Sequence, residues 1–306
     1  MFAYYNSLIE QECKQLGYKT ERKTASRFSC NGVEFLKTTA SPASARQICR
    51  NKVQTHKYVT EVGLHVPNHY IIHKGEKIEQ KLPFPLVVKP VDSSLGNMVY
   101  VNITDEENFL KRADEVIQRR GKVLVEEYIS GKKYRVFSTN KKTVSVIEYE
   151  PSEVVGDGKS SIRSLVRTFN MKKVSANKKF PKAKFPVLNI MNGVLEAQGY
   201  KQISVPPKGA RILVNNLSTR AAGSHSKEIL TEENRSFFDF CHLAVDSVPM
   251  LKTTGVDIII EDETGRKIVL EMNGTPHLRA NLWPLEGHPQ PVIRELVNAY
   301  FPNGEA

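Results

Sequence analysis

Cysteine is scarce in this sequence, and its four cysteines are not spaced as a metal or redox motif. Cys13, Cys30, Cys49 and Cys241 include no pair with the CxxC spacing. Zinc sites of the finger type and thioredoxin-like redox sites depend on such pairs, so neither class is indicated. Unpaired cysteines are typical of a reducing compartment. We therefore expect a cytoplasmic protein whose cysteines act as small apolar side chains.

Long apolar runs are missing as well. The longest apolar stretches span a handful of residues, as in PLVV and DIII. A membrane-spanning helix needs roughly 18 apolar residues, so we expect no span and no membrane partner. The N-terminus has no basic region ahead of its apolar residues and no small-residue cleavage site, so we expect no secretory signal.

Acidic residues are absent from one long segment of a basic chain. The whole sequence has 44 Lys and Arg against 33 Asp and Glu, a net charge of +11. Nine basic residues and no acidic residue lie between Asp157 and Glu196. A like-charge block of this kind is typical of a solvated loop, whereas a positive balance favours anionic partners. We expect a basic loop at residues 159–184, with a clamp for an anionic substrate as the alternative.

Secondary-structure signals predict a mixed α+β fold of about two domains. An apolar stripe at three- and four-residue steps predicts a helix over residues 2–17, and Asn31-Gly32 between two β-prone runs predicts a hairpin. These elements form a small N-terminal unit, residues 1–40. A helix beginning at Ser41-Pro42 is expected to run to about Gly63. Short strands alternate with helices beyond it.

The segment Gly255 to Gly274 is the most informative one, because carboxylates interrupt apolar strands. A three-residue turn ending at Gly265 would place Asp257 opposite Glu271, with Asn273 two residues further on the same face. Two carboxylates and an amide oxygen are hard ligands suited to Mg²⁺ or Mn²⁺. The alternative is a buried acid pair bridged by Lys or Arg.

A phosphate-binding segment is expected to accompany such a metal. The stretch PFPLVVKPVDSSLGNMVYV predicts a strand ending at Lys89-Pro90, a small polar loop over residues 92–97, and a second strand. Backbone N–H groups in such a turn and a nearby ammonium suit phosphate oxygens. With Gly96 as its single glycine, the loop matches neither a dinucleotide fingerprint nor a Walker motif.

Several motifs, in order along the chain, resemble one known family. They are SPASARQICRNKVQTHKYVTEVGLHVP, VLVEEYISGKKYRVF, IEYEPSEVVGDGKSSIRSLV, NLST, GVDIII and EMNGTPHLRANLWPLEG. They are similar to the ATP-grasp domain of cyanophycin synthetases and bifunctional glutathione synthetases, and more distantly to D-alanine–D-alanine ligases. The resemblance covers about residues 1–303. It implies an ATP-grasp fold, with two α+β subdomains clasping a nucleotide between two sheets.

The resemblance also implies roles for individual residues. The nucleotide would be held by two lysines that neutralise phosphate charge, by the loop 92–97 as a lid, and by a hinge that receives adenine: Lys52, Lys89, Ser93, Ser94, Gly96, Glu126, Glu127, Tyr128 and Ile129. Two magnesium ions, or manganese, would be held by Asp257, Glu271 and Asn273, with Glu271 bridging the ions. Arg135 and Arg279 would bind the reacting carboxylate and its phosphorylated form, beside Lys89; ordinary surface ion pairs are the alternative for both arginines.

The implied reaction joins a carboxylate to an amine through an acyl phosphate, with release of ADP and phosphate. The substrate would be an amino acid or peptide, and the basic composition points to an anionic one. The chain departs from the family pattern in its single-glycine lid, in Lys133 where relatives place an acid for the ribose hydroxyls, and in Arg220 after NLST. The alternatives are an enzyme that modifies a carrier protein or nucleic acid, and a degenerate nucleotide-binding protein.

We expect three parts along the chain: the N-terminal unit 1–40, a small lid subdomain 41–125 that includes the helix beginning at Ser41, and a C-terminal subdomain 126–306 that carries the metal site and the basic loop. Relatives commonly pair, so a homo-oligomer is an open option.

Overall fold

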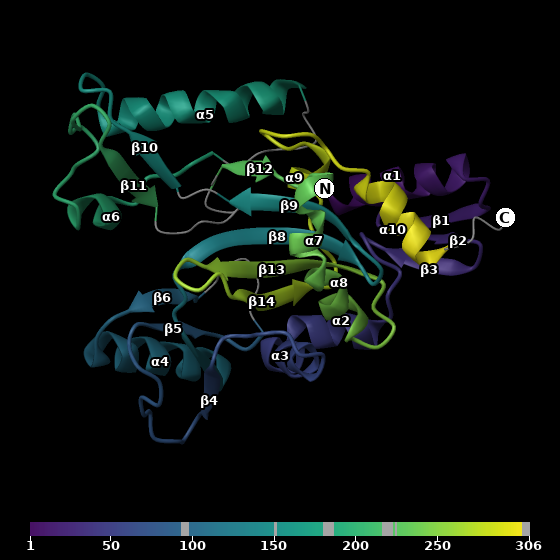
Figure 1. Ribbon diagram of the computed structural model, residues 1–306, viewed down its shortest axis with the longest axis horizontal. Helices are drawn as coiled ribbons and strands as arrows, with labels where there is room; N and C mark the ends of the chain where they lie inside the picture. Colours follow the sequence, from purple (N-terminus) through teal and green to yellow (C-terminus); the bar gives the residue numbers. More distant parts are fainter. Residues whose placement is uncertain (93–97, 150–151, 180–186, 216–222, 224, 302–306) are drawn as a thin grey trace.

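The computed structural model describes residues 1–92, 98–149, 152–179, 187–215, 223 and 225–301. Within these residues helices are combined with antiparallel sheets, so the fold is α+β, as predicted (Figure 1). No helix among the described residues is long and apolar enough to cross a membrane.

The N-terminal unit combines one helix with a three-stranded sheet. Its elements are α1 (Phe2–Gln15), β1 (Thr20–Thr24), β2 (Arg27–Cys30) and β3 (Val33–Leu36). Asn31 and Gly32 form the turn between β2 and β3 with φ of 42° and 80°, as the Asn-Gly signal predicted. Tyr5, Phe28 and Phe35 are buried in a core that this unit shares with α10 (Val292–Tyr300). The unit therefore packs on the C-terminal helix.

A five-stranded sheet forms the centre of the molecule, in the order β12-β9-β8-β13-β14. Its strands are β8 (Gly131–Thr139), β9 (Thr143–Tyr149), β12 (Ser226–Glu228), β13 (Thr253–Glu261) and β14 (Lys267–Asn273). One face is covered by α2 (Ala43–Arg50), α3 (Lys52–Glu61), α7 (Glu232–Phe238) and α8 (Phe240–Asp246). Side chains alternate along β13, so Val256 and Ile258 enter this core and Asp257 takes the opposite face.

A second sheet of four strands, in the order β4-β7-β5-β6, lies beside the first. Its elements are β4 (His69–His73), β5 (Leu86–Lys89), β6 (Tyr100–Ile103), β7 (Lys122–Glu127) and the covering helix α4 (Glu106–Arg120). Phe109, Ala113 and Val116 of α4 pack on the strands to form a separate core. Residues 128–130 connect β7 to β8 and so join the two sheets.

The helix expected over residues 41–63 is two helices, which corrects that prediction. The chain leaves the helical conformation at Asn51, whose side chain accepts hydrogen bonds from the backbone N–H groups of Val53 and Gln54. Asn51 is therefore the N-cap of α3, and Lys52 is its first residue. Both helices pack on the five-stranded sheet, although the sequence grouped them with the lid subdomain.

The basic segment is mostly helical, so the expected loop at 159–184 is wrong. Helix α5 spans Ile162–Lys179, because Ile162, Val166 and Leu165 recur on one face and pack on a small core. With β10 (Ser152–Val155), α6 (Asn192–Glu196) and β11 (Arg211–Asn215) it forms a projecting unit, which we call the arm, residues 152–215 (Figure 1). Residues 180–184 of the expected loop lie outside the described residues.

Candidate functional site

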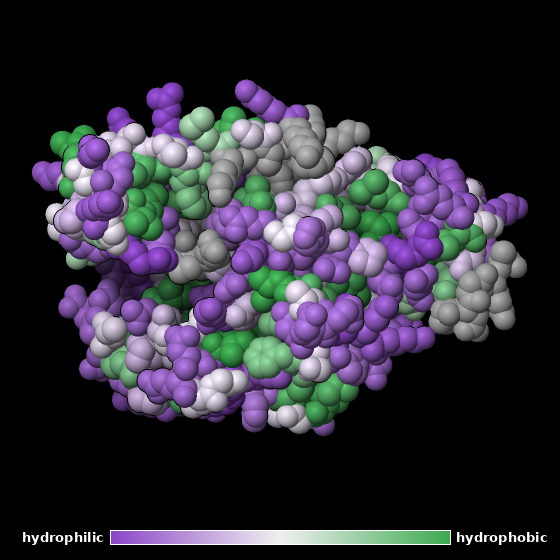
Figure 2. Space-filling model, turned by 45° about the horizontal axis from the view of Figure 1, so that its top comes forward, coloured by the Kyte–Doolittle hydropathy of each residue, from purple (hydrophilic) through white to green (hydrophobic). Residues whose placement is uncertain are grey.

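The face of the five-stranded sheet that carries Asp257 lies near the four-stranded sheet. The backbone N–H of Lys52 donates to the carbonyl of Val91 at 3.1 Å, which ties the start of α3 to the segment that follows β5. On α3, the His56 ring lies 3.1 Å from the Leu270 carbonyl of β14. Figure 2 shows the surface hollowed between the arm and the four-stranded part, with hydrophilic residues on both sides.

Two lysines predicted to bind nucleotide phosphates lie together in this region. The Nζ atom of Lys89 is 2.6 Å from Oε2 of Glu126, and the Nζ atom of Lys52 is 3.6 Å from Oε2 of Glu271. Both lysine side chains are almost fully buried, at 8% and 5% exposed. Burial lowers the pKa of Lys52, and Glu271 acts against that shift. Ammonium groups held out of water in this way exert a strong field on an anion that enters the site.

Asp257 and Glu271 face each other across β13 and β14, as the sequence predicted. The route to this register differs from the expected one. Ile260 pairs with Lys267 near a turn longer than the three-residue turn, and a bulge between Asp257 and Ile258 shifts the pairing by one residue. The bulge therefore offsets the longer turn and returns both carboxylates to one face.

Arg135 of β8 bridges this acid pair. Its Nε donates to Oδ1 of Asp257 at 2.5 Å, its second terminal nitrogen donates to Oδ2 of Asp257, and that nitrogen lies 4.0 Å from Glu271. The acid pair is thus half-buried, with side chains 19% and 32% exposed, and Arg135 lies within 4.0 Å of both members. Arg135 is not in an ordinary surface ion pair, because it and Asp257 are only 22% and 19% exposed.

The third expected ligand, Asn273, contacts both acids. Its amide nitrogen lies 3.5 Å from Oδ2 of Asp257 and 3.5 Å from Oε1 of Glu271. Burial raises the pKa of Asp257 to about 6, against the opposing effect of Arg135. Burial acts the same way on Glu271, but Lys52, the hydrogen bond with Asp257 and Arg135 outweigh it and lower its pKa to about 2. The pKa values of the two acids are thus shifted in opposite directions.

Lys133 adds another cation to the same face. It lies two residues before Arg135 on β8, so the two side chains share a side of the sheet. Burial lowers the pKa of Lys133, Lys89 lowers it further, and Asp257 opposes the shift. Lys133, at the position where the resemblance implies an acid, therefore adds positive charge to the site.

The hinge residues have distinct surroundings. The Glu127 carboxylate accepts hydrogen bonds from the backbone and side-chain nitrogens of Asn68, each at 3.0 Å. The N–H of Tyr128 donates to the carbonyl of Pro85 at 3.0 Å, and Ile129 packs with Ile259 and Ile268. The side chain of Glu126 is directed to Lys89.

Arg279 begins α9 (Arg279–Leu282) and is buried, at 7% exposed. Ser93, Ser94 and Gly96 of the expected lid lie outside the described residues, as does Arg220.

The sequence did not indicate one buried cluster on the same face. Glu228 of β12 accepts hydrogen bonds from the Ser145 hydroxyl and from the backbone N–H groups of Val146 and Leu230, and Asn281 of α9 donates to Ser145 at 2.7 Å. Burial raises the pKa of Glu228 to about 7. Glu228 was missed because a single Glu in the segment SKEIL has no spacing that marks it.

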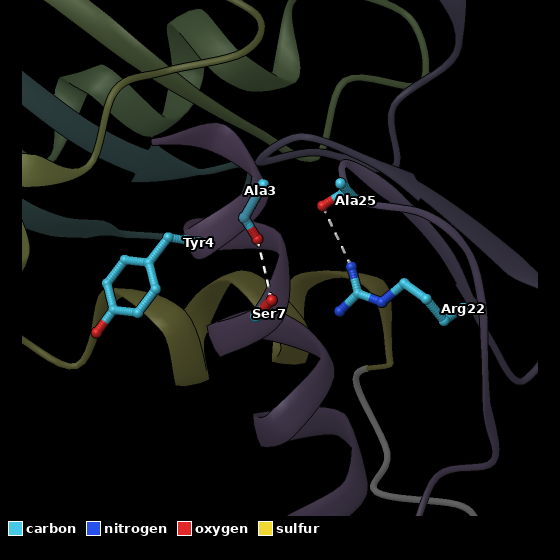
Figure 3. A pocket seen from close by; sticks show the side chains of 5 residues that line it. All are labelled: Ala3, Tyr4, Ser7, Arg22 and Ala25. Atoms are coloured by element: carbon cyan, nitrogen blue, oxygen red, sulfur yellow. Dashed lines mark hydrogen bonds between the residues drawn. The ribbon is translucent and has the colours of Figure 1, made fainter. Parts of the chain in front are cut away.

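A separate hollow of about 440 Å³ lies on the N-terminal unit, lined by Ala3, Tyr4, Ser7, Arg22 and Ala25 (Figure 3). The guanidinium of Arg22 is already engaged with Asn6 and Glu10, and it also reaches the Ala25 carbonyl at 3.4 Å. Arg22 therefore ties the β1–β2 turn to α1.

The donor set fits a divalent cation in its chemistry. The described residues contain no group of three or more His, Cys, Asp or Glu placed to hold a metal, so a cation here would rely on two carboxylates and the amide oxygen of Asn273. Oxygen donors of this kind, completed by water and phosphate oxygens, suit Mg²⁺. Asp257 would have to release one oxygen from Arg135, and the Asn273 amide would have to turn its oxygen inward.

Two α+β parts, each with its own sheet, come together at a face that carries both lysine and arginine cations and the carboxylates of Glu126, Asp257 and Glu271. The chain matches the family model described as ATP-grasp domain over residues 49–277, and it belongs to that family.

Two curated relatives show where the similarity extends. The chain is 26% identical over 277 residues to cyanophycin synthetase of Synechocystis sp., covering 84% of this chain and 31% of the relative. It is 26% identical over 263 residues to the glutathione biosynthesis bifunctional protein of Desulfotalea psychrophila, covering 81% and 33%. The chain thus spans about a third of the length of these relatives.

Solved structures support the fold. The bifunctional glutathione synthetase from Pasteurella multocida aligns with a TM-score of 0.64 at 20% identity, over 97% of this chain and 44% of that chain. D-alanine–D-alanine ligase from Bacillus anthracis aligns with a TM-score of 0.52 at 15% identity, over 86% and 69%. Their identity is low, so they establish the ATP-grasp fold alone.

Proposed function

We propose that this protein is an ATP-dependent carboxylate–amine ligase that forms an amide bond through an acyl phosphate. The observation that carries the proposal is the convergence of Lys52, Lys89 and Arg135 with the acid pair Asp257 and Glu271 in a chain of the ATP-grasp family. The names of the similar proteins, synthetases and ligases, support the reaction class.

The residues of the site would act mainly by position and charge. Lys52 and Lys89 would neutralise the α- and β-phosphates, and their carboxylate partners Glu271 and Glu126 would keep the ammonium groups in place. The hinge at Glu126 to Ile129 would receive adenine. Residues 92–97 would close over the γ-phosphate and exclude water, which otherwise hydrolyses an acyl phosphate.

Asp257, Glu271 and Asn273 would hold Mg²⁺ or Mn²⁺, with Glu271 shared between two ions. The ions would supply neutralisation of phosphate charge. Arg135 would bind the substrate carboxylate once Asp257 binds a metal ion instead of Arg135. Support comes from the paired hydrogen bonds that its guanidinium forms with the Asp257 carboxylate. Arg279 would be the second carboxylate-binding cation.

The reaction balances without a dedicated nucleophilic side chain. A carboxylate oxygen of the substrate attacks the γ-phosphorus, the bond from that phosphorus to the β-phosphate oxygen breaks, and ADP leaves. The amine nitrogen then attacks the acyl carbon, the carbon–oxygen bond to phosphate breaks, and the amine loses a proton. Phosphate is the second product.

We propose an amino acid or peptide as the substrate, and an anionic one, because the site face carries several cations. We also propose a reducing, cytoplasmic setting, which is supported by the four buried free cysteines.

A phosphate-release assay tests the function. ATP and Mg²⁺ are combined with pooled amino acids and dipeptides, and wild type is compared with Lys89→Ala and Asp257→Asn. Lys111→Ala on the exposed side of α4 is the matched control. We expect substrate-dependent release that both site variants lose and the control keeps. Unchanged turnover in Asp257→Asn would remove the metal assignment, and ATP binding without release under every mixture would favour a degenerate nucleotide-binding protein.

A further inference from the structure

Almost all of the excess positive charge belongs to the arm. Residues 152–215 contain twelve Lys and Arg against three Asp and Glu, a net charge of +9 out of +11 for the chain. The arm also has its own core, formed by Val154, Ile162, Val166 and further residues of β10, α5, α6 and β11. The charge is therefore concentrated on a separately packed unit.

Helix α5 presents one exposed stripe along the arm. Arg163, Arg167, Met171, Val174 and Lys178 follow each other at three- or four-residue steps, so they lie on one side of the helix. All five are exposed, with Met171 at 62% and Val174 at 45%. We call these residues the α5 stripe; its ends are cationic and its middle is apolar.

The orientation of α5 is fixed by its opposite side. Ile162 and Val166 are buried there, and the Lys173 ammonium donates to the carbonyl of Gly223 and lies 4.8 Å from the centre of the Phe169 ring. Lys173 is 1% exposed, so this contact ties the C-terminal half of α5 to the chain just ahead of β12. The stripe thus faces solvent on a helix that is anchored to the body.

We propose that the α5 stripe binds an acidic peptide segment that also carries apolar side chains. Carboxylates would pair with Arg163, Arg167 and Lys178, and an apolar side chain would cover Met171 and Val174. Met adapts its shape readily to such contacts. A nucleic acid would leave the apolar middle uncovered, and the described part of the arm has no exposed aromatic side chain on which a base could stack.

The position of the stripe suggests what the peptide is. Figure 1 shows α5 along the side of the arm away from the four-stranded sheet, and Lys173 connects it to the start of β12, an edge strand of the sheet that carries the site. A peptide held there belongs to the substrate and has its reacting carboxylate elsewhere along its length. This last step rests on the proposed function, whereas the binding itself requires no ATP.

Fluorescence anisotropy tests the binding. A short fluorescein-labelled peptide of repeated Glu-Glu-Leu units is titrated with the full chain without ATP, beside an oligoglutamate of equal charge and a single-stranded oligothymidylate. We expect the mixed peptide to bind most tightly. The double variant Arg167→Glu/Lys178→Glu should weaken its binding about tenfold, since two attractive contacts become repulsive. Met171→Ser/Val174→Ser should weaken binding of the mixed peptide and leave binding of oligoglutamate unchanged.

The matched control, Lys74→Glu/Lys111→Glu, reverses the charge of two exposed lysines outside the arm. It changes the net charge by the same amount as Arg167→Glu/Lys178→Glu. Equal losses in the control and the α5 variant would show attraction to net charge only and overturn the proposal. Tighter binding of oligothymidylate would overturn it in favour of a nucleic acid. Lys89→Ala should bind the peptide normally, because the binding requires no ATP. A wild-type chain that binds the peptide but releases no phosphate with any substrate would refute the ligase function alone.

Discussion

Lys89 and Glu126 form a buried ion pair whose contribution to the free energy of unfolding depends on both partners. The Glu126 side chain is 2% exposed and Lys89 is 8% exposed, so removing the lysine leaves a buried carboxylate without the ammonium that lies 2.6 Å from it. The loss of one member of such a pair is costly, whereas replacement of both by neutral groups is much less so.

The Lys89–Glu126 pair therefore gives a prediction that separates stability from ligand binding. Lys89→Met should lower the free energy of unfolding by about 3 kcal/mol. Lys89→Met/Glu126→Gln should recover most of that loss while still failing to bind ATP. Urea unfolding and calorimetric titration with ATP measure the two effects; recovery of ATP affinity in the double variant would contradict the role of Lys89.

Glu228 gives a pH-dependent prediction. Its pKa rises from 4.5 to about 7 on folding, because burial disfavours the ionised form. The folded chain therefore holds a proton that the unfolded chain releases, so stability falls as pH rises from about 4.5 through 7. In Glu228→Gln this decline should be smaller by up to about 3 kcal/mol. Thermal unfolding from pH 5 to pH 8.5 measures the difference; parallel curves would contradict it.

Single residues show how far sequence reasoning can reach. The predicted pairing of Asp257 with Glu271 is correct, but local spacing alone does not produce it, because a bulge compensates for a turn longer than the expected one. The bridge by Arg135 was not assigned, since it depends on β8 lying beside β13, and these strands are more than a hundred residues apart. Glu228 and Lys173 were missed for the same reason, because their burial is created by tertiary contacts.

The helices illustrate the same limit. The charge of the basic segment predicts a loop, yet Ile162, Leu165 and Val166 supply an apolar face sufficient for a helix once β10 and β11 cover it. The break between α2 and α3 was not predicted, because the apolar pattern around Asn51 does not show that one helix ends there and another begins.

The separate core of the arm predicts that it can be removed. A chain in which residues 152–215 are replaced by a short glycine and serine linker should keep the fold of both sheets, because the arm core shares no residue with the other cores of the described chain. We expect near-native circular dichroism, a cooperative thermal transition and loss of acidic-peptide binding. A chain that fails to fold would show that the arm is an integral part of the body.

The molecule as a whole combines the two larger sheets, the N-terminal unit and the arm, and the charged face lies where the two larger sheets come together. We propose a division into the N-terminal unit, the four-stranded lid part, and a C-terminal part that includes α2, α3 and the arm. The fold class and family could be predicted because several motifs occur in order along the chain, and the family match over residues 49–277 confirms them. The identity of the substrate could not be predicted in this way. The chain spans only about a third of the length of its curated relatives, so their substrates do not carry over to it.

The central claim is that Asp257 and Glu271 hold the divalent ions that accompany ATP. Crystals grown with Mn²⁺ and a non-hydrolysable ATP analogue test it most directly, because anomalous scattering locates manganese. We predict a manganese peak between Asp257, Glu271 and Asn273, with Arg135 turned away from Asp257. A nucleotide bound with Arg135 still paired to Asp257, and no manganese beside either carboxylate, would contradict the account.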